Sequence, residues 1–387
     1  MVEWKKLGEI CYISDYVSNG SFASLRKNVE YKTTPDYAIL VRVVDYSNGF
    51  DRDKFVYIDE KAYNFLAKSS LEGGEIIMSN VGSCGLLFRC PQLDKKMSLA
   101  PNAILIKSQY IDYLYYWLGS NMGQEEIKKI TSHSAMPKFN KTEFKKIPCP
   151  IPSISEQTRI VGILDTFTSA IDNLKAQIAL RRKQYEYYRD QLLDLEGKDG
   201  VERKKLGDVC GIFDGTHQTP KYTDSGIRFV SVENINSLYD SEKYISTEDF
   251  NAQYKTKPQK GDVLMTRIGD VGTCAVINRE EPIAYYVSLA LLKPNKDYVI
   301  NFYIKYILES RIGKIELRKR TLLTAVPLKI NLGDVCKITI PIPSLSEQQR
   351  IVSILDTFEA SIQNLEAQLK QREKQYEYYR NKLLTFE

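Results

Sequence analysis

Two long stretches of the chain carry apolar residues at alternating steps of four and three. They lie within residues 151–198 and 341–387. The first series is Ile160, Leu164, Phe167, Ile171, Leu174, Ile178, Tyr185, Tyr188, Leu192 and Leu195, and the second is Ile351, Leu355, Phe358, Ile362, Leu365, Leu369, Tyr376, Tyr379, Leu383 and Phe386. Arg181 and Arg372 occupy the slots that would complete each series. This period is that of a coiled-coil seam, so each stretch predicts one helix of about 40 residues, about 60 Å long.

The start of each helix is marked by proline and serine. Pro152 and Pro343 disfavour helix immediately before them. Ser153 or Ser155 is expected to cap the first helix, because a serine hydroxyl accepts a hydrogen bond from a free amide of the first turn.

The two stretches are copies of each other. Residues 150–196 and 341–387 are identical at 31 of 47 aligned positions without a gap. Looser matches precede them, between residues 5–8 and 204–207, 74–78 and 261–265, 98–100 and 288–290, and 135–137 and 325–327. The chain therefore divides into front domains over residues 1–150 and 199–340, each followed by its helix. Similar tails behind diverged front domains favour one fold used for two recognition tasks, with neutral drift as the alternative.

The two helices are expected to pair with each other. Each carries an apolar stripe that it cannot bury alone, and the duplication favours a pseudo-two-fold axis that sets them antiparallel. Residues 197–200 supply a short turn with two glycines after the first helix. The alternative is pairing between two chains of a homodimer.

Short apolar runs between turn residues predict strands in the front domains. Examples are residues 37–44, 75–78, 227–232 and 262–265, while residues 111–118 and 302–308 have a helical pattern. The predicted fold class is therefore α/β (α+β): two similar mixed α/β domains with largely antiparallel sheets, joined by a pair of long antiparallel coiled-coil helices.

Polar loops of the front domains are the candidate DNA-binding sites. In residues 266–272 the glycines lie three apart, and an arginine there could bind guanine bidentately. The first-half counterpart is residues 79–85, where asparagine replaces that arginine, and residues 214–222 form a third polar loop. The candidate residues are Ser79, Asn80, Ser83, Thr216, His217, Gln218, Lys221, Thr266, Arg267 and Asp270. The alternative is that each loop is a structural turn.

The helices also repeat residues that lie outside the seam. These are Gln184, Tyr187 and Arg189 in the first copy and Gln375, Tyr378 and Arg380 in the second. Exposed surface usually diverges, so we expect a partner-binding face that is used once per copy. An ordinary charged helix face is the alternative.

Composition restricts the chemistry further. The net charge of +5, from 54 basic and 49 acidic residues, permits nucleic-acid binding without requiring it. Two histidines exclude a site built on several imidazoles, and seven cysteines without a Cys-x-x-Cys pair predict small buried hydrophobes rather than disulfides or structural zinc. No phosphate-binding loop occurs, and no apolar run spans a membrane. We expect a cytoplasmic protein with no cofactor, no bound metal and no membrane contact.

These residues together carry a family resemblance over nearly the whole chain. The duplicated Pro-Ile-Pro-Ser, Ser-Glu-Gln, Arg-Ile-Val and Ile-Leu-Asp run, the Ala-x-Pro pair and the Lys-Lys-Leu-Gly start of each half resemble specificity subunits of type I restriction–modification systems. The resemblance implies two target-recognition domains that each read half of a split double-stranded DNA target. It also implies helices that space those domains and bind two modification (methyltransferase) subunits, which bring S-adenosylmethionine. Restriction subunits would add ATP-driven translocation and cleavage, and this chain would not be an enzyme.

Two other classes of function remain as alternatives. A coiled-coil scaffold with two protein-binding heads would co-purify with proteins and ignore DNA at physiological salt. A self-contained enzyme is disfavoured by the missing motifs.

Overall fold

A computed structural model describes residues 2–218 and 220–386. Its contacts form two units, Met1–Asn173 with Gln368–Glu387, and Leu174–Ala367. Each unit holds one front domain, the beginning of the helix that follows it and the end of the helix from the other half. The division into residues 1–150, 151–198, 199–340 and 341–387, drawn from the sequence, stays a prediction.

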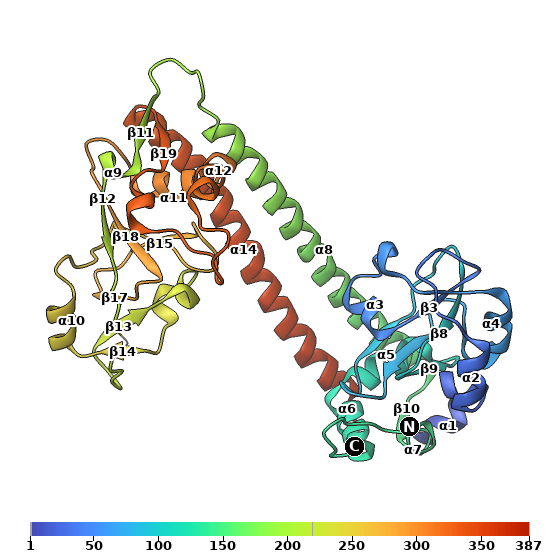
Figure 1. The fold of residues 1–387 in the computed structure, drawn as a ribbon. Helices are drawn as coiled ribbons and strands as arrows, with labels where there is room; N and C mark the ends of the chain where they lie inside the picture. The colour runs from blue at the N-terminus through green and yellow to red at the C-terminus, as the bar shows by residue number, and fades with distance from the viewer. Residues whose placement is uncertain (1, 219, 387) are drawn as a thin grey trace. The chain divides into compact units, whose positions relative to one another are not determined.

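The first unit contains two small sheets and a two-stranded ribbon (Figure 1). The antiparallel sheet has the order β2-β9-β6-β7, the mixed sheet has the order β4-β3-β8-β5, and β1 pairs with β10. The strands are β1 Glu3–Lys6, β2 Tyr12–Asp15, β3 Ala38–Val41, β4 Tyr57–Ile58, β5 Ser70–Leu71, β6 Ile76–Ser79, β7 Leu87–Arg89, β8 Lys96–Leu99, β9 Ala103–Lys107 and β10 Pro148–Ile151. The helices of this front domain are α1 Leu7–Ile10, α2 Phe22–Asn28, α3 Val43–Ser47, α4 Glu60–Phe65, α5 Ile111–Gly119, α6 Asn121–Ile130 and α7 Lys141–Phe144.

The second unit repeats this plan. Its antiparallel sheet is β12-β18-β15-β16, its mixed sheet is β14-β13-β17, and β11 pairs with β19. The strands are β11 Glu202–Lys205, β12 Cys210–Asp214, β13 Ile227–Val230, β14 Tyr244–Ile245, β15 Val263–Thr266, β16 Cys274–Val276, β17 Ile283–Tyr285, β18 Leu289–Pro294 and β19 Thr339–Ile342. The helices of this front domain are α9 Leu206–Val209, α10 Thr247–Gln253, α11 Asn301–Glu309, α12 Arg311–Arg320 and α13 Leu332–Val335.

The mixed α/β class, the largely antiparallel sheets and the duplication are confirmed, with one correction to the matching of the two halves. The mixed sheets contain a parallel pair in each unit, β3 with β8 and β13 with β17. The match between residues 98–100 and 288–290 is wrong. Ser98 lies in β8, whereas Ser288 accepts the amide of Arg267 as Asn102 accepts that of Asn80. Short apolar runs of similar sequence occur on neighbouring strands of each unit. Matching by residue identity alone therefore aligned β8 of the first unit with β18 of the second, although β8 corresponds to β17.

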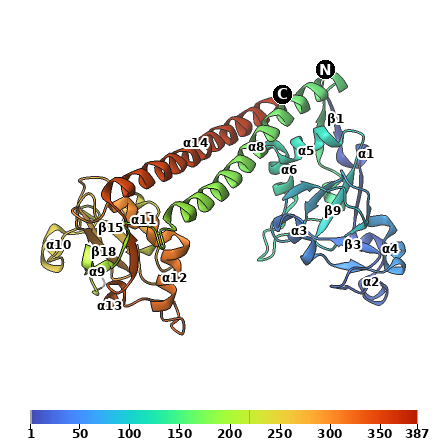
Figure 2. The same ribbon diagram turned by 90° about the horizontal axis from the view of Figure 1, so that it is seen from above.

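The long helices are α8 Ile154–Leu193 and α14 Leu345–Leu384, each uninterrupted over its whole length (Figure 2). The Ser153 hydroxyl accepts the amide of Glu156 at 3.3 Å, so Ser153 rather than Ser155 is the cap. The side-chain amide of the buried Gln157 donates to the carbonyl of Pro152 at 2.9 Å, and Gln348 repeats this bond to Pro343 at 2.9 Å. The Ser-Glu-Gln run therefore holds the strand-to-helix corner.

The seam between the helices is antiparallel and lies within one chain. In the first unit Phe167 of α8 stacks on Tyr379 of α14, with ring centroids 5.4 Å apart. In the second unit the equivalent Tyr188 and Phe358 stack at 5.5 Å. The arginines of the unfilled seam slots lie over these phenylalanines, at 5.7 Å for Arg372 on Phe167 and 5.8 Å for Arg181 on Phe358. A cation over an aromatic face explains why arginine fits there.

Each unit's core includes the end of the helix that began in the other half of the sequence. Leu384 is fully buried in the first unit's core, with Leu383 and Phe386 packed against it. Leu193 and Leu195 hold the equivalent place in the second unit. Leu195 lies past the last residue of α8, so the predicted seam extends slightly beyond the helix.

Paired tyrosines join each front domain to its own helix. The hydroxyl of Tyr116 on α5 donates to Asp165 of α8 at 2.5 Å, and that of Tyr306 on α11 donates to Asp356 of α14 at 2.5 Å. These aspartates are the last residues of the repeated Ile-Leu-Asp run. The repetition of that run therefore has a structural cause.

The cysteines are unpaired, and Cys90, Cys149, Cys210 and Cys274 are buried as expected, while the other three are half-buried. Within the described residues, no helix is long and apolar enough to cross a membrane.

Candidate nucleic-acid interface

Each front domain has a recognition loop, which we define as residues 79–85 in the first unit and 266–272 in the second. Gly82, Gly85, Gly269 and Gly272 have φ values of 79°, 87°, 81° and 103°. Such positive values favour glycine, so the spacing that predicted tight turns has a backbone cause. Ser83 and Asp270 are exposed in these loops.

The first residue of each recognition loop has an internal role. Ser79 and Thr266 are 2% and 1% exposed. The Thr266 hydroxyl accepts the amides of Gly272 at 3.1 Å and Thr273 at 2.9 Å, and the Ser79 hydroxyl accepts the amide of Leu86 at 3.1 Å. These two candidates close the loops and do not present a side chain to a ligand.

A second loop that the sequence analysis did not select lies beside each recognition loop. These Ala-x-Pro loops are residues 132–138 and 322–329. In the first unit the amide of Gly82 donates to Pro137 at 2.8 Å and that of Phe139 donates to Asn80 at 3.1 Å. The second unit repeats both bonds, from Gly269 to Leu328 at 2.8 Å and from Ile330 to Arg267 at 2.9 Å. The match between residues 135–137 and 325–327 was the available signal, but it was used only as a sign of the duplication and of the family resemblance.

Asn80 and Arg267 occupy equivalent places but make different contacts. The Asn80 side-chain amide donates to the carbonyl of Phe139 at 3.2 Å, and its Oδ1 is buried without a partner. Arg267 makes the equivalent bond from Nε to Ile330 at 3.3 Å and continues to Asp214, with which its Nη1 forms an ion pair. Arg267 is only 8% exposed because its guanidinium turns toward Asp214, and its contact with a guanine stays a prediction.

The equivalent acid in the first unit finds its cation elsewhere. Asp15 ends β2 as Asp214 ends β12, and Lys141 of α7 contacts it at 2.9 Å. The position of Lys141 is taken by Leu332 in the second unit. The two front domains thus neutralise equivalent aspartates with cations from different elements, α7 in the first unit and the recognition loop in the second.

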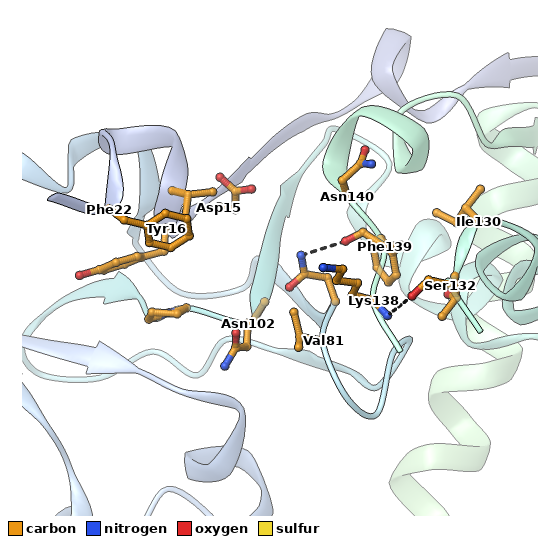
Figure 3. Close-up of a pocket in the computed structure, with 15 residues that line it drawn as sticks. Asp15, Tyr16, Phe22, Val81, Asn102, Ile130, Ser132, Lys138, Phe139 and Asn140 are labelled. Atoms are coloured by element: carbon orange, nitrogen blue, oxygen red, sulfur yellow. Dashed lines mark hydrogen bonds between the residues drawn. The ribbon is translucent and has the colours of Figure 1, made fainter. Parts of the chain in front are cut away.

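The shorter Asn80 is accompanied by an open pocket of about 650 Å³ in the first unit. Figure 3 shows Asp15, Tyr16 and Phe22 on one side and Lys138, Phe139 and Asn140 on the other, with Asn102 below. Carboxylate, amide and ammonium groups therefore line one cavity next to the recognition loop.

The third candidate loop, residues 214–222, is partly buried. Thr216 is 7% exposed and accepts the amide of Val287 at 3.0 Å. His217, Gln218 and Lys221 are exposed, and Nε2 of His217 lies 3.0 Å from Asp214. Thr219 lies outside the described residues. This loop offers three accessible polar side chains beside the Asp214–Arg267 pair.

The outer helix face is exposed at its centre. Tyr187 and Tyr378 are 61% and 59% exposed, and each stacks edge-on with the following tyrosine. Gln184, Gln375 and Arg380 are half-buried. Arg189 is 8% exposed and lies over Tyr185 at 5.6 Å, so the expectation that it forms exposed surface is wrong.

A family model described as the type I restriction modification DNA specificity domain matches residues 1–180 and again residues 198–373. The chain belongs to the type I restriction modification DNA specificity family. The two matches reproduce the duplication seen in the sequence and in the two units.

Relatives of this specificity family span most of the chain. A putative type I restriction enzyme specificity subunit of Haemophilus influenzae is 29% identical and covers 100% of this chain and 96% of its own length. The EcoR124I/EcoR124II specificity subunit of Escherichia coli is 32% identical over 71% of each chain. A crystal structure of a type I restriction–modification S subunit from M. genitalium has a TM-score of 0.60 at 14% identity and covers 100% of this chain and 97% of that one. This likeness confirms the fold.

The differences between the two halves of this chain are consistent with membership of a DNA specificity family. Residues shared by the two halves cap the long helices and fill the cores, whereas positions 80 and 267 and the exposed side chains of the Ala-x-Pro loops differ. Within the described residues no cluster of His, Cys, Asp and Glu is arranged to hold a metal ion.

Proposed function

We propose that this chain is the non-catalytic DNA-recognition subunit of a cytoplasmic type I restriction–modification complex. Each front domain reads one half of a split double-stranded target, and the long helices bind two modification subunits. Methyl transfer and restriction then belong to the partner subunits.

One observation carries the proposal: two front domains share a framework but differ at the surface beside it. Asn80 with an open pocket in one unit stands against the Arg267–Asp214 pair in the other. Two such surfaces suit two different half-targets, since base contacts specify sequence while a common framework only positions them.

Sequencing the DNA methylation of cells with and without this gene tests the proposal. The expected result is the loss of one split methylated motif when the gene is absent. An unchanged methylome in a strain whose modification subunits are expressed would contradict DNA recognition, and co-purification with proteins without DNA binding would support a scaffold instead.

A further inference from the structure

The Ala-x-Pro loops expose apolar side chains. Met136 is 65% exposed and Val326 is 99% exposed, each directly before the proline of its loop. The second loop adds Leu322, Leu323 and Leu328, exposed by 40%, 56% and 40%. Single exposed apolar residues are common, but four within seven residues form a patch that marks a binding surface.

These loops are held in place by hydrogen bonds at their base. Leu322 donates its amide to the carbonyl of Lys329 at 2.8 Å, as Ser132 does to Lys138 at 2.9 Å. The backbone hydrogen bonds from Gly82 to Pro137 and from Gly269 to Leu328 also hold each Ala-x-Pro loop against its recognition loop. A loop with a fixed base presents its exposed side chains with little loss of conformational entropy on binding.

The surroundings of the loops are basic. The helix before the second loop ends in Arg318, Lys319 and Arg320, of which Lys319 and Arg320 pair with Glu316. The helix before the first loop ends in Lys128 and Lys129, of which Lys129 pairs with Glu126. Exposed lysines, Lys138 and Lys329, follow the apolar residues. An apolar projection between cations matches a DNA groove between phosphate strands better than it matches an apolar protein surface.

We propose that each Ala-x-Pro loop enters the major groove and places Met136 or Val326 against the 5-methyl group of a thymine. This deepens the proposed function and rests on it. The thymine methyl is the apolar group that base pairs display in the major groove. Met136 is long and unbranched while Val326 is short and branched, so the two half-targets would be contacted at different depths.

The test uses the complex with its modification subunits and a duplex carrying the split methylated sequence. Each thymine is replaced singly by deoxyuridine, which removes only the methyl group. Val326→Ser is expected to weaken binding about tenfold, the effect of losing two buried methyl groups. In this variant the deoxyuridine penalty should vanish at one thymine of the second half-target and persist in the other half. Met136→Ser should give the mirror-image result.

Two controls separate the possible explanations. Val326→Ser should unfold at the wild-type temperature, because the side chain contacts almost nothing in the fold. Lys329→Gln should weaken binding to target and non-target duplexes alike, because a phosphate contact carries no sequence information.

Unchanged affinity of both serine variants would overturn the proposal. Loss of modification subunits from the variant, with unchanged affinity of the remaining complexes, would also overturn it and identify a protein surface as the occupant. A wild-type complex that does not bind its own duplex would refute the proposed function and this inference together.

Discussion

At the scale of single residues, the Arg267–Asp214 pair is the sharpest difference between the two front domains. Arg267→Ala leaves the half-buried Asp214 without its cation and the carbonyl of Ile330 without its donor. We expect the free energy of unfolding of the second unit to fall by about 1–3 kcal/mol. Chemical denaturation monitored by circular dichroism measures this loss.

Lys141→Ala is the matched control in the first unit. Its partner Asp15 is the equivalent acid, but the Lys141 side chain is 30% exposed, so the cost should be below about 1 kcal/mol. If Arg267→Ala unfolds like the wild type and loses affinity for one half-target only, then Arg267 binds a base and the structural role assigned here is wrong.

The buried carboxyl of Glu309 is expected to lower the stability of the protein as the pH rises. Burial raises the pKa of its carboxyl above the usual value of 4.5, although Lys305 nearby opposes this shift. The native pKa therefore exceeds the unfolded one, and the ionised carboxylate costs stability as the pH rises through the native pKa. Glu309→Gln keeps an acceptor for the amide of Cys274 and should stabilise the protein at neutral pH. Thermal unfolding should show no advantage below pH 4.5.

Glu316→Gln supplies the contrasting control in the same unit. Burial acts to raise the pKa of Glu316, but bonds from Lys319, Thr339 and Arg320 outweigh burial and lower it. Removing this charge should destabilise the protein at neutral pH and have little effect in acid. Equal effects of the two substitutions would contradict the assignment of Glu309 as an unfavourable buried charge.

At the scale of elements, the exposed tyrosines of the long helices form the candidate partner face. Tyr187→Ala or Tyr378→Ala should weaken binding of one modification subunit by about 2 kcal/mol, because exposed aromatic residues dominate many interfaces. The double variant should lose both subunits. Calorimetric titration with purified modification subunit measures the stoichiometry and affinity.

Lys183→Ala changes an exposed residue of the same helix and should leave binding unchanged. Full binding by the double tyrosine variant would move the docking face elsewhere on the helices.

The elements also show which features can be predicted from sequence. The steps of four and three predicted α8 and α14 well, because an apolar stripe on a long helix has few other solutions. The glycine spacing predicted the backbone of the recognition loops. The partner of Arg267 could not be predicted, because Asp214 lies on another strand 53 residues away. The Ala-x-Pro loops were missed because apolar residues in a loop carry no period that separates surface from core.

At the scale of the whole molecule, two helices of 40 residues run through both units. If they set the spacing of the half-targets, seven residues inserted at matched points in both should lengthen the gap. Seven residues add about 10.5 Å, or about three base pairs, and nearly restore the helix face. The methylome of the insertion strain shows the new spacing. A folded and active variant with the original gap would contradict the spacing role.

The burial of Leu384 and Phe386 in the first unit has a consequence for synthesis on the ribosome. Residues 1–173 leave the ribosome long before residues 368–386, yet these segments share one core. The first unit must therefore wait, with part of its apolar surface uncovered, while about 200 further residues are translated, which takes about 10–40 s at about 5–20 residues per second. The second unit lacks this delay, because its borrowed helix end, Leu193 and Leu195, is translated before the rest of it. The second unit can therefore complete its core before the first unit does, although it comes later in the sequence. Translation that stops before residue 368 would leave the core of the first unit incomplete, even though most of that unit had already been made.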